Sequence, residues 1–203
     1  MSLRTLSAAF LAVCLASEAF AAKPPSFTVA SVEGGVLTLK GKPVAVGEVL
    51  RDGAVVRLDA GRAVLDLGDE GRLKLTGPAE FKVGPRAFTL LRGALLSVLP
   101  RLRGAFSVGT PIAVAAVRGT DFFVEAREDG RTYLCLCDGV LEVTGKPGSG
   151  YRKAVRSNHH GSYIFSQHGK RLDRGPWKME GHTDGDIGEL KKPRPEPPPV
   201  PQR

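Results

Sequence analysis

Two cysteines, Cys135 and Cys137, and two histidines further along the chain, His159 and His160, are the residues of this sequence best suited to chemistry. In an extended strand successive side chains alternate between faces, so the two thiols share one face and the intervening Leu136 lies on the other. If the leucine enters the core, the thiols point outward. Free, exposed thiols are unusual in an oxidising compartment unless something binds or covers them.

Three interpretations of the cysteine pair follow. Two thiolates on one strand face form half of a tetrahedral site, which an imidazole of His159 or His160 would extend, and these donors suit Zn(II), Cu(I) or a related ion. A disulfide between Cys135 and Cys137 would join α-carbons ~6.6 Å apart in an extended strand, at the strained end of the permitted range. Alternatively, both cysteines are small apolar residues buried beneath residues 151–190. The sequence alone leaves all three open.

Other histidines could complete a metal site. Adjacent residues of a strand point to opposite faces, so we expect only one of His159 and His160 to join the cysteines. His182 and Asp184 could complete the coordination sphere if the C-terminal region folds back over the sheet, and His168 is a further candidate. The Cys-x-x-Cys-His pattern of covalently attached haem is absent. The candidate metal ligands are therefore Cys135, Cys137, His159 and His160, with His182 as a fifth candidate.

The sequence contains no recognisable set of catalytic groups. The Gly-x-Ser-x-Gly, phosphate-loop and His-Glu-x-x-His motifs are all absent. Acidic residues occur mostly at turns, where they favour solubility rather than acid–base chemistry. We therefore expect a protein that is not an enzyme.

The cysteines belong to a long series of short apolar runs. From residue 26 to residue 143 these runs recur at a spacing of about ten residues, and turn-forming pairs such as Asp52–Gly53 and Arg92–Gly93 separate them. The alternation in residues 64–67 is typical of a sheet with one buried and one solvated face. The predicted fold class is all-β: an antiparallel β-sandwich or rolled sheet of many short strands, followed by a mostly irregular C-terminal region.

Composition divides the chain into four segments. An early arginine, an apolar run and the cleavage site Ala19-Phe20-Ala21 are typical of a secretory signal peptide, which predicts a periplasmic or secreted protein. Thr183, three residues before Asp186, predicts a helix of one or two turns near the C-terminus. The expected segments are a signal peptide at 1–21, a β domain at 22–146, a polar extension that packs on the sheet at 147–192, and a disordered proline-rich tail at 193–203.

The chain is basic, with 29 Lys and Arg against 21 Asp and Glu and a net charge of +8. Because export removes the chain from the cytosol, we expect no nucleic-acid partner, and an envelope protein or an anionic glycan suits the charge better. Beyond the signal peptide no apolar stretch approaches the ~18 residues of a membrane span. The sequence does not indicate an oligomeric state.

The segment from residue 106 to residue 143 has a specific order of features: a Thr-Pro pair, an apolar strand, Arg-Gly-Thr, a second apolar strand, an acidic-Gly hairpin and a third strand. This order resembles the FecR domain, the periplasmic module of ferric-citrate-type signalling regulators. With similar hairpins upstream, the resemblance covers most of residues 27–145. It implies an extracytoplasmic β domain that senses or binds something in the envelope, and it implies no active site. The matching positions are Thr110–Pro111, 114–117, Arg118–Gly119–Thr120, 122–124, Asp129–Gly130 and 139–143.

No cytoplasmic anti-sigma region and no membrane helix precede the domain in this sequence, so we expect a free-standing module that cannot relay a signal across a membrane alone. Within the motif, the Arg118 guanidinium could bind a carboxylate or phosphate ligand, or it could close the turn onto local carbonyls.

Two functional hypotheses result. The first is an exported FecR-like module that binds or senses a component of the cell envelope. The second is a metal-binding or thiol-redox protein that uses Cys135 and Cys137 with His159 or His160 and a Zn or Cu ion as cofactor. The two are compatible, because a metal could be what the module senses.

Overall fold

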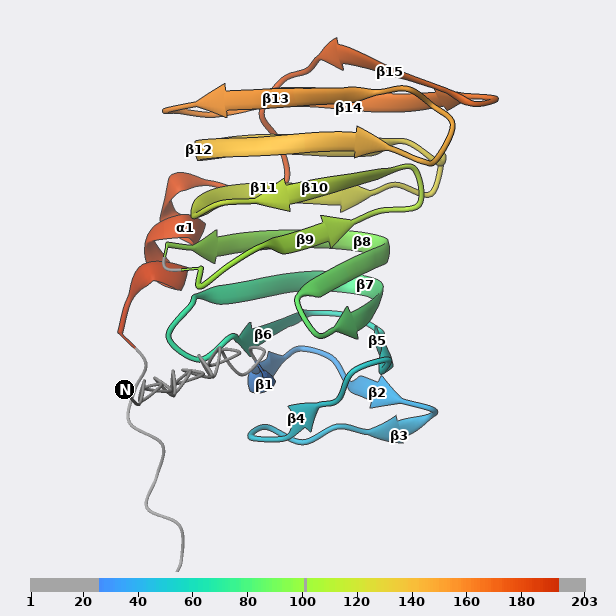
Figure 1. Cartoon of the computed structure of the whole chain (residues 1–203). Coiled ribbons are helices and arrows are strands. Elements are labelled where there is room, and N and C mark those ends of the chain that lie inside the picture. The colour runs from blue at the N-terminus through green and yellow to red at the C-terminus, as the bar shows by residue number, and fades with distance from the viewer. Residues whose placement is uncertain (1–25, 101, 194–203) are drawn as a thin grey trace, which may run out of the picture.

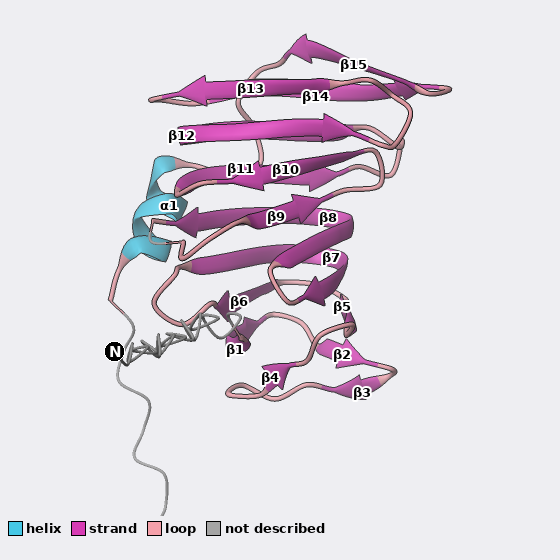
Figure 2. Cartoon of the chain, in the orientation of Figure 1, coloured by secondary structure: helices cyan, strands magenta, loops and turns pink. Residues whose placement is uncertain are grey.

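The computed structural model describes residues 26–100 and 102–193, so the signal peptide expected at 1–21 and all but the first residue of the expected tail lie outside the described residues. Within these two ranges the chain forms 15 strands and one helix, α1 (Asp184–Lys191), as Figures 1 and 2 show. No helix of the described ranges is long and apolar enough to cross a membrane.

All 15 strands belong to one sheet. Among the described residues only β8 and β9 pair in parallel, and every other pairing is antiparallel, as predicted. The strands are β1 (Phe27–Glu33), β2 (Leu37–Leu39), β3 (Lys42–Pro43), β4 (Val49–Leu50), β5 (Val55–Leu58), β6 (Arg62–Asp66), β7 (Arg72–Gly84), β8 (Ala87–Leu99), β9 (Phe106–Gly109), β10 (Ala113–Val117), β11 (Thr120–Ala126), β12 (Thr132–Gly145), β13 (Arg152–Ser157), β14 (Gly161–His168) and β15 (Arg171–Pro176).

Three long strands carry the sheet from one layer to the other. The first half of β12 pairs with β11 and β14, which we call the first layer, and its second half pairs with β10 and β13, which we call the second layer. Strands β7 and β8 divide between the layers in the same way. The sequence predicted a β-sandwich or a rolled sheet, and the structure is one sheet rolled into two layers (Figure 1).

Glycines permit the bends in these long strands. Gly93 in β8 has φ 95°, and a β-carbon there would lie 2.6 Å from the Pro78 carbonyl oxygen. Gly139 in β12 has φ 103°, and its β-carbon would lie 2.7 Å from Cγ2 of Thr120. Any other residue would meet both a left-handed backbone and a steric clash at these corners.

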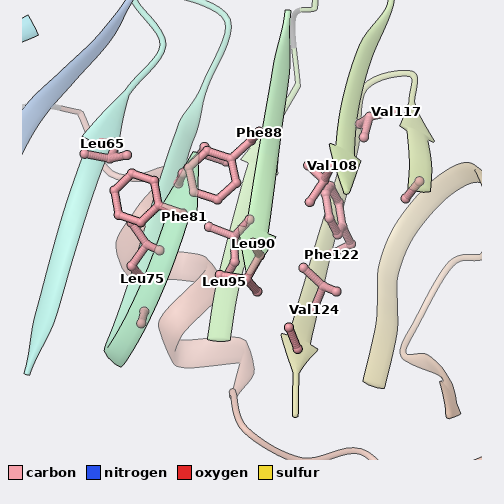
Figure 3. Close-up of a cluster of buried hydrophobic side chains, with 14 of the residues drawn as sticks. Leu65, Leu75, Phe81, Phe88, Leu90, Leu95, Val108, Val117, Phe122 and Val124 are labelled. Atoms are coloured by element: carbon pink, nitrogen blue, oxygen red, sulfur yellow. The ribbon is translucent and has the colours of Figure 1, made fainter. Parts of the chain in front are cut away.

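The main hydrophobic core fills the space between the layers, because strand alternation directs every second side chain inward. On β12 these inward residues are Leu134 and Leu136 in its first half and Leu141 and Val143 in its second half. Phe81 and Phe88 stack with their ring centroids 4.9 Å apart. Figure 3 shows the side chains that gather around them, among them Leu75, Leu90, Leu95, Val108, Phe122 and Val124.

A second apolar cluster lies on the outer face of the first layer. Phe123 and Tyr133 belong to it, and residues 177–192, which we call the strap, cover it and contribute Ile187 and Leu190. The outer face of this layer is therefore buried by a segment that follows the last strand.

The strap is fixed by its helix and by ion pairs. The Thr183 side chain caps α1 and Asp186 completes the capping box, as predicted. Asp186 also accepts from Nζ of Lys74 at 2.5 Å, and Nζ of Lys191 lies 2.6 Å from a carboxylate oxygen of Asp121. Two of the four charges, Lys74 and Asp121, come from strands of the sheet, so ion pairs bind the strap to the sheet near both ends of α1.

The region after Gly150 is more regular than its polar sequence indicates. Strands β13, β14 and β15 extend the same sheet, and only the strap departs from it. Long polar side chains on one face of β13 hide the alternation, yet Val155 on this strand and Phe165 on β14 still point into the main core.

Candidate metal centre

Cys135 and Cys137 lie on the first half of β12 and project from its outer face, while Leu134 and Leu136 enter the main core. The alternation predicted from the sequence is therefore correct. The outward face is not solvated, however, because the strap covers it, and the two cysteines are only 0% and 5% exposed. Both thiols are free.

Two histidines from different segments reach the two sulfurs. Nδ1 of His160, on the turn between β13 and β14, lies 3.5 Å from Sγ of Cys135. Nε2 of His182, on the strap, lies 3.2 Å from Sγ of Cys137. The four ligand atoms all lie within 4.8 Å of one another. Residues from three segments, 22 to 47 positions apart along the chain, thus form one compact cluster.

Only His160 of the His159–His160 pair approaches the sulfurs, but both residues lie on a turn, where His160 has φ 45°, and not on a strand, so strand alternation is not the reason. His159 is exposed, and its ring meets the ring of His160 with centroids 4.5 Å apart. Ser157 shapes this turn, because its hydroxyl accepts hydrogen bonds from the backbone N–H groups of His159 and Gly161. His168, at the end of β14, is exposed and belongs to neither group of candidate ligands found among the described residues.

Each clustered histidine has a partner on its other nitrogen. Nδ1 of His182 lies 3.1 Å from the Glu180 carbonyl oxygen, which can only accept, so Nδ1 carries the proton and Nε2 presents a lone pair toward Cys137. Nε2 of His160 lies 2.8 Å from Oδ1 of Asp184, which leaves Nδ1 facing Cys135. A carbonyl or carboxylate behind the imidazole is the usual arrangement for a histidine that binds a metal.

Aromatic packing closes the site. The ring of Phe123 stacks on His182 with centroids 4.7 Å apart and 12° between the planes. The Tyr133 hydroxyl donates to the Ser162 hydroxyl at 3.3 Å and accepts from the Glu180 backbone N–H at 3.0 Å. These contacts hold the strap residues next to His182 against β12 and exclude water from that side.

Hydrogen bonds and burial set the protonation of the cluster. The Cys137 thiol lowers the pKa of Cys135 from its ordinary value of 9.0 to about 3, despite burial. The same contact, together with burial, raises the pKa of Cys137. Burial disfavours a charged imidazole at His160, but hydrogen bonds with Asp184 and Cys135 outweigh it and raise its pKa. The hydrogen bonding within the pair thus favours a negative charge on Cys135, which a bound cation would neutralise.

The donor set fits a tetrahedral metal ion. With metal–sulfur bonds of about 2.3 Å and metal–nitrogen bonds of about 2.0–2.1 Å, a tetrahedral angle places sulfur and nitrogen ligands about 3.6 Å apart. The two closest sulfur–nitrogen separations here are 3.5 and 3.2 Å. Ligation by Cys135, Cys137, His160 and His182 would thus need shifts of a few tenths of an ångström for these pairs. Four protein ligands would leave no position for a substrate.

Other candidate residues lie elsewhere. Arg118, between β10 and β11, is exposed, and no side-chain hydrogen bond or ion pair joins it to another described residue. The sequence pattern ranked His182 below His159 and His160, and it offered Asp184 as a metal ligand and not as the hydrogen-bond partner of His160 that the structure shows. The signal that could have found them is the capping box at Thr183, because it places both residues at the start of a helix whose apolar side must pack on the sheet.

Comparisons with known proteins bear on the β domain. A family model described as "FecR protein" matches residues 44–142. The crystal structure of a candidate anti-sigma factor from Parabacteroides distasonis has a similar fold, with a TM-score of 0.50 and 18% sequence identity over 60% of this chain and 59% of that one. The chain thus spans about three-fifths of that structure. No curated protein matches the sequence. The family match includes Cys135 and Cys137 and ends before His160 and His182.

Proposed function

The chain carries a FecR domain over residues 44–142, and from this premise we propose that it is an exported sensing module of the cell envelope whose ligand is a transition-metal ion. The ion binds to Cys135, Cys137, His160 and His182. The module acts by binding and not by catalysis. Its sheet supplies the sulfur ligands, and the region beyond the family match supplies the imidazoles.

One observation carries this proposal: two buried sulfurs and two imidazole nitrogens converge from three segments, with each imidazole held from behind by an oxygen. If the cysteines served only as small apolar residues, nothing would require an imidazole nitrogen beside each sulfur. A thiol that exchanges disulfides must be reachable by its partner, and both sulfurs are buried under the strap. Metal binding accounts for the burial and for the orientation of both rings.

Zn(II) is the ion that the donor set fits best. Two sulfur and two nitrogen donors in a closed, four-coordinate arrangement are typical of structural zinc. Cu(I) also favours thiolates, and a preference for it would change the signal sensed but not the ligands.

Charge supports an anionic partner outside the metal site, either an envelope protein or an anionic glycan. Strands β13 and β15 end the second and first layers, respectively, so each has one neighbour in the sheet. Their exposed basic residues form one end of the stack of strands. Arg152 and Arg171 are paired with Glu142 and Asp173, and the excess positive charge comes from Lys153, Arg156 and Arg174. A localised positive potential of this kind favours association with polyanions.

Elemental analysis of the mature protein, purified from the envelope fraction without chelator, tests the proposal. We expect one zinc per chain, lost in a Cys135→Ser/Cys137→Ser double variant and reduced in His160→Ala. His168→Ala is the matched control, because this exposed histidine lies outside the cluster, and it should keep the full metal content. A wild-type protein that stays metal-free after incubation with Zn(II) and with Cu(I) would refute metal sensing.

A further inference from the structure

One ligand of the buried cluster, His160, also lies beside donor atoms of surface residues. His159, His160 and Asp184 place one ligand atom each within 4.8 Å of one another. His159 and Asp184 are exposed, whereas the His160 side chain is only 8% exposed. His160 belongs both to this outer group and to the inner group with the sulfurs.

The other inner ligands are sealed from solvent. Cys135 and Cys137 lie under the strap, and Phe123 covers the ring of His182. An ion that approaches the sulfurs while the strap is docked must therefore pass on the side of His160. A hydrated ion sheds its waters more readily when protein ligands replace them in steps, and the outer group offers such ligands at this opening.

The outer group is already formed in the folded chain. The Ser157 hydroxyl holds the turn that carries His159, and Asp184 is the first residue of α1. Oδ1 of Asp184 lies 2.8 Å from Nε2 of His160. With three donors the group leaves at least one coordination position to water, as in sites that exchange a ligand. In a chain with a net charge of +8, the Asp184 carboxylate also supplies local attraction for a cation.

We propose that His159, Asp184 and His160 form an outer capture site, at which a Zn(II) ion binds before it moves to the two cysteines, His160 and His182. This inference rests on the proposed function. Asp184 has two successive roles: it binds the incoming ion, and it then accepts the hydrogen bond from Nε2–H of His160 once Nδ1 binds the ion in the inner site. His159 acts only in capture and does not touch the ion in its final position.

Rates of metal loading separate capture from final binding. The apo protein is mixed with Zn(II), and the loading rate, the equilibrium Kd and the stoichiometry are measured for the wild type, His159→Ala, Asp184→Asn and the control His168→Ala. For His159→Ala we expect loading slower by roughly tenfold, with the Kd within about twofold of the wild-type value. Asp184→Asn should slow loading and also weaken the Kd by about 10–100-fold, because His160 loses its partner. His168→Ala should change neither quantity.

The outcomes are distinguishable. A His159→Ala variant that loads at the wild-type rate overturns the capture site while leaving the inner site intact. An equal loss of rate and affinity in this variant would make His159 a ligand of the final site, which also overturns the proposal. If the wild-type protein binds no zinc, the proposed function itself is refuted.

Discussion

Zinc should lock the strap to the sheet, because His182 is the strap's own ligand. Without the ion, the buried side chains of Ile187 and Leu190, the contacts with Phe123 and Tyr133, the capping box and a few ion pairs hold the strap. An isolated helix of eight residues is marginal in water, so α1 depends on docking for its stability. We therefore predict that removing zinc loosens the strap while the sheet stays folded.

The magnitude follows from the contacts. Burying Ile187 and Leu190 stabilises the docked strap by roughly 1.5–3 kcal/mol each, and the entropy of ordering the strap residues opposes docking. Zinc at a concentration 100 times its Kd stabilises the docked state by about 2.7 kcal/mol. This free energy corresponds to an opening equilibrium about 100-fold less favourable.

Native-state hydrogen exchange measures this opening residue by residue. Amide protons of α1 should exchange about 100-fold more slowly in zinc than in chelator, while those of β7 and β8 in the main core should not change. In His182→Ala, which keeps the other three ligands, α1 should exchange at the same fast rate with and without zinc. Stoichiometric zinc binding to the wild-type chain with no slowing in α1 would refute the idea that His182 clamps the strap.

Three further perturbations test the strap and its charges. Thr183→Ala removes the cap of α1 and should destabilise the docked helix by about 1 kcal/mol, seen as faster α1 exchange both with and without zinc. At position 181, where φ is 80°, the β-carbon of Gly181→Ala would lie 2.6 Å from Cζ of Phe123. This variant should destabilise the docked strap by more than about 1 kcal/mol and weaken zinc binding in a titration. Unchanged zinc affinity would count against the Phe123 contact. The hydrogen bond from Lys74 lowers the pKa of Asp186 from 3.8 to about 2. The ionised Asp186 carboxylate therefore stabilises the docked strap by under about 1 kcal/mol after solvent screening. This stabilisation is present above pH 4 and is lost as the pH falls toward 2. Lys74→Met should remove this pH dependence from α1 exchange measured in chelator.

The strand pattern and the family resemblance could be predicted from the sequence. Turn glycines and two-residue alternation are local properties, and they correctly placed Leu134 and Leu136 in the core with Cys135 and Cys137 on the opposite face. The family match over residues 44–142 confirms the resemblance. How the sheet rolls was harder to predict from the sequence, because a bend at a residue such as Gly93 depends on the atoms that pack against it from other parts of the chain.

By itself, then, the sequence determined an all-β fold with FecR-type hairpins, and it determined that two thiols share one face of a strand. Only the tertiary structure decided that this face is covered, that His160 and not His159 turns toward the sulfurs, and that His182 completes the set. The physical reason is distance along the chain. Alternation fixes which face a side chain occupies within one strand, whereas the position of the strap depends on packing and ion pairs between residues more than 100 positions apart, such as Lys74 and Asp186.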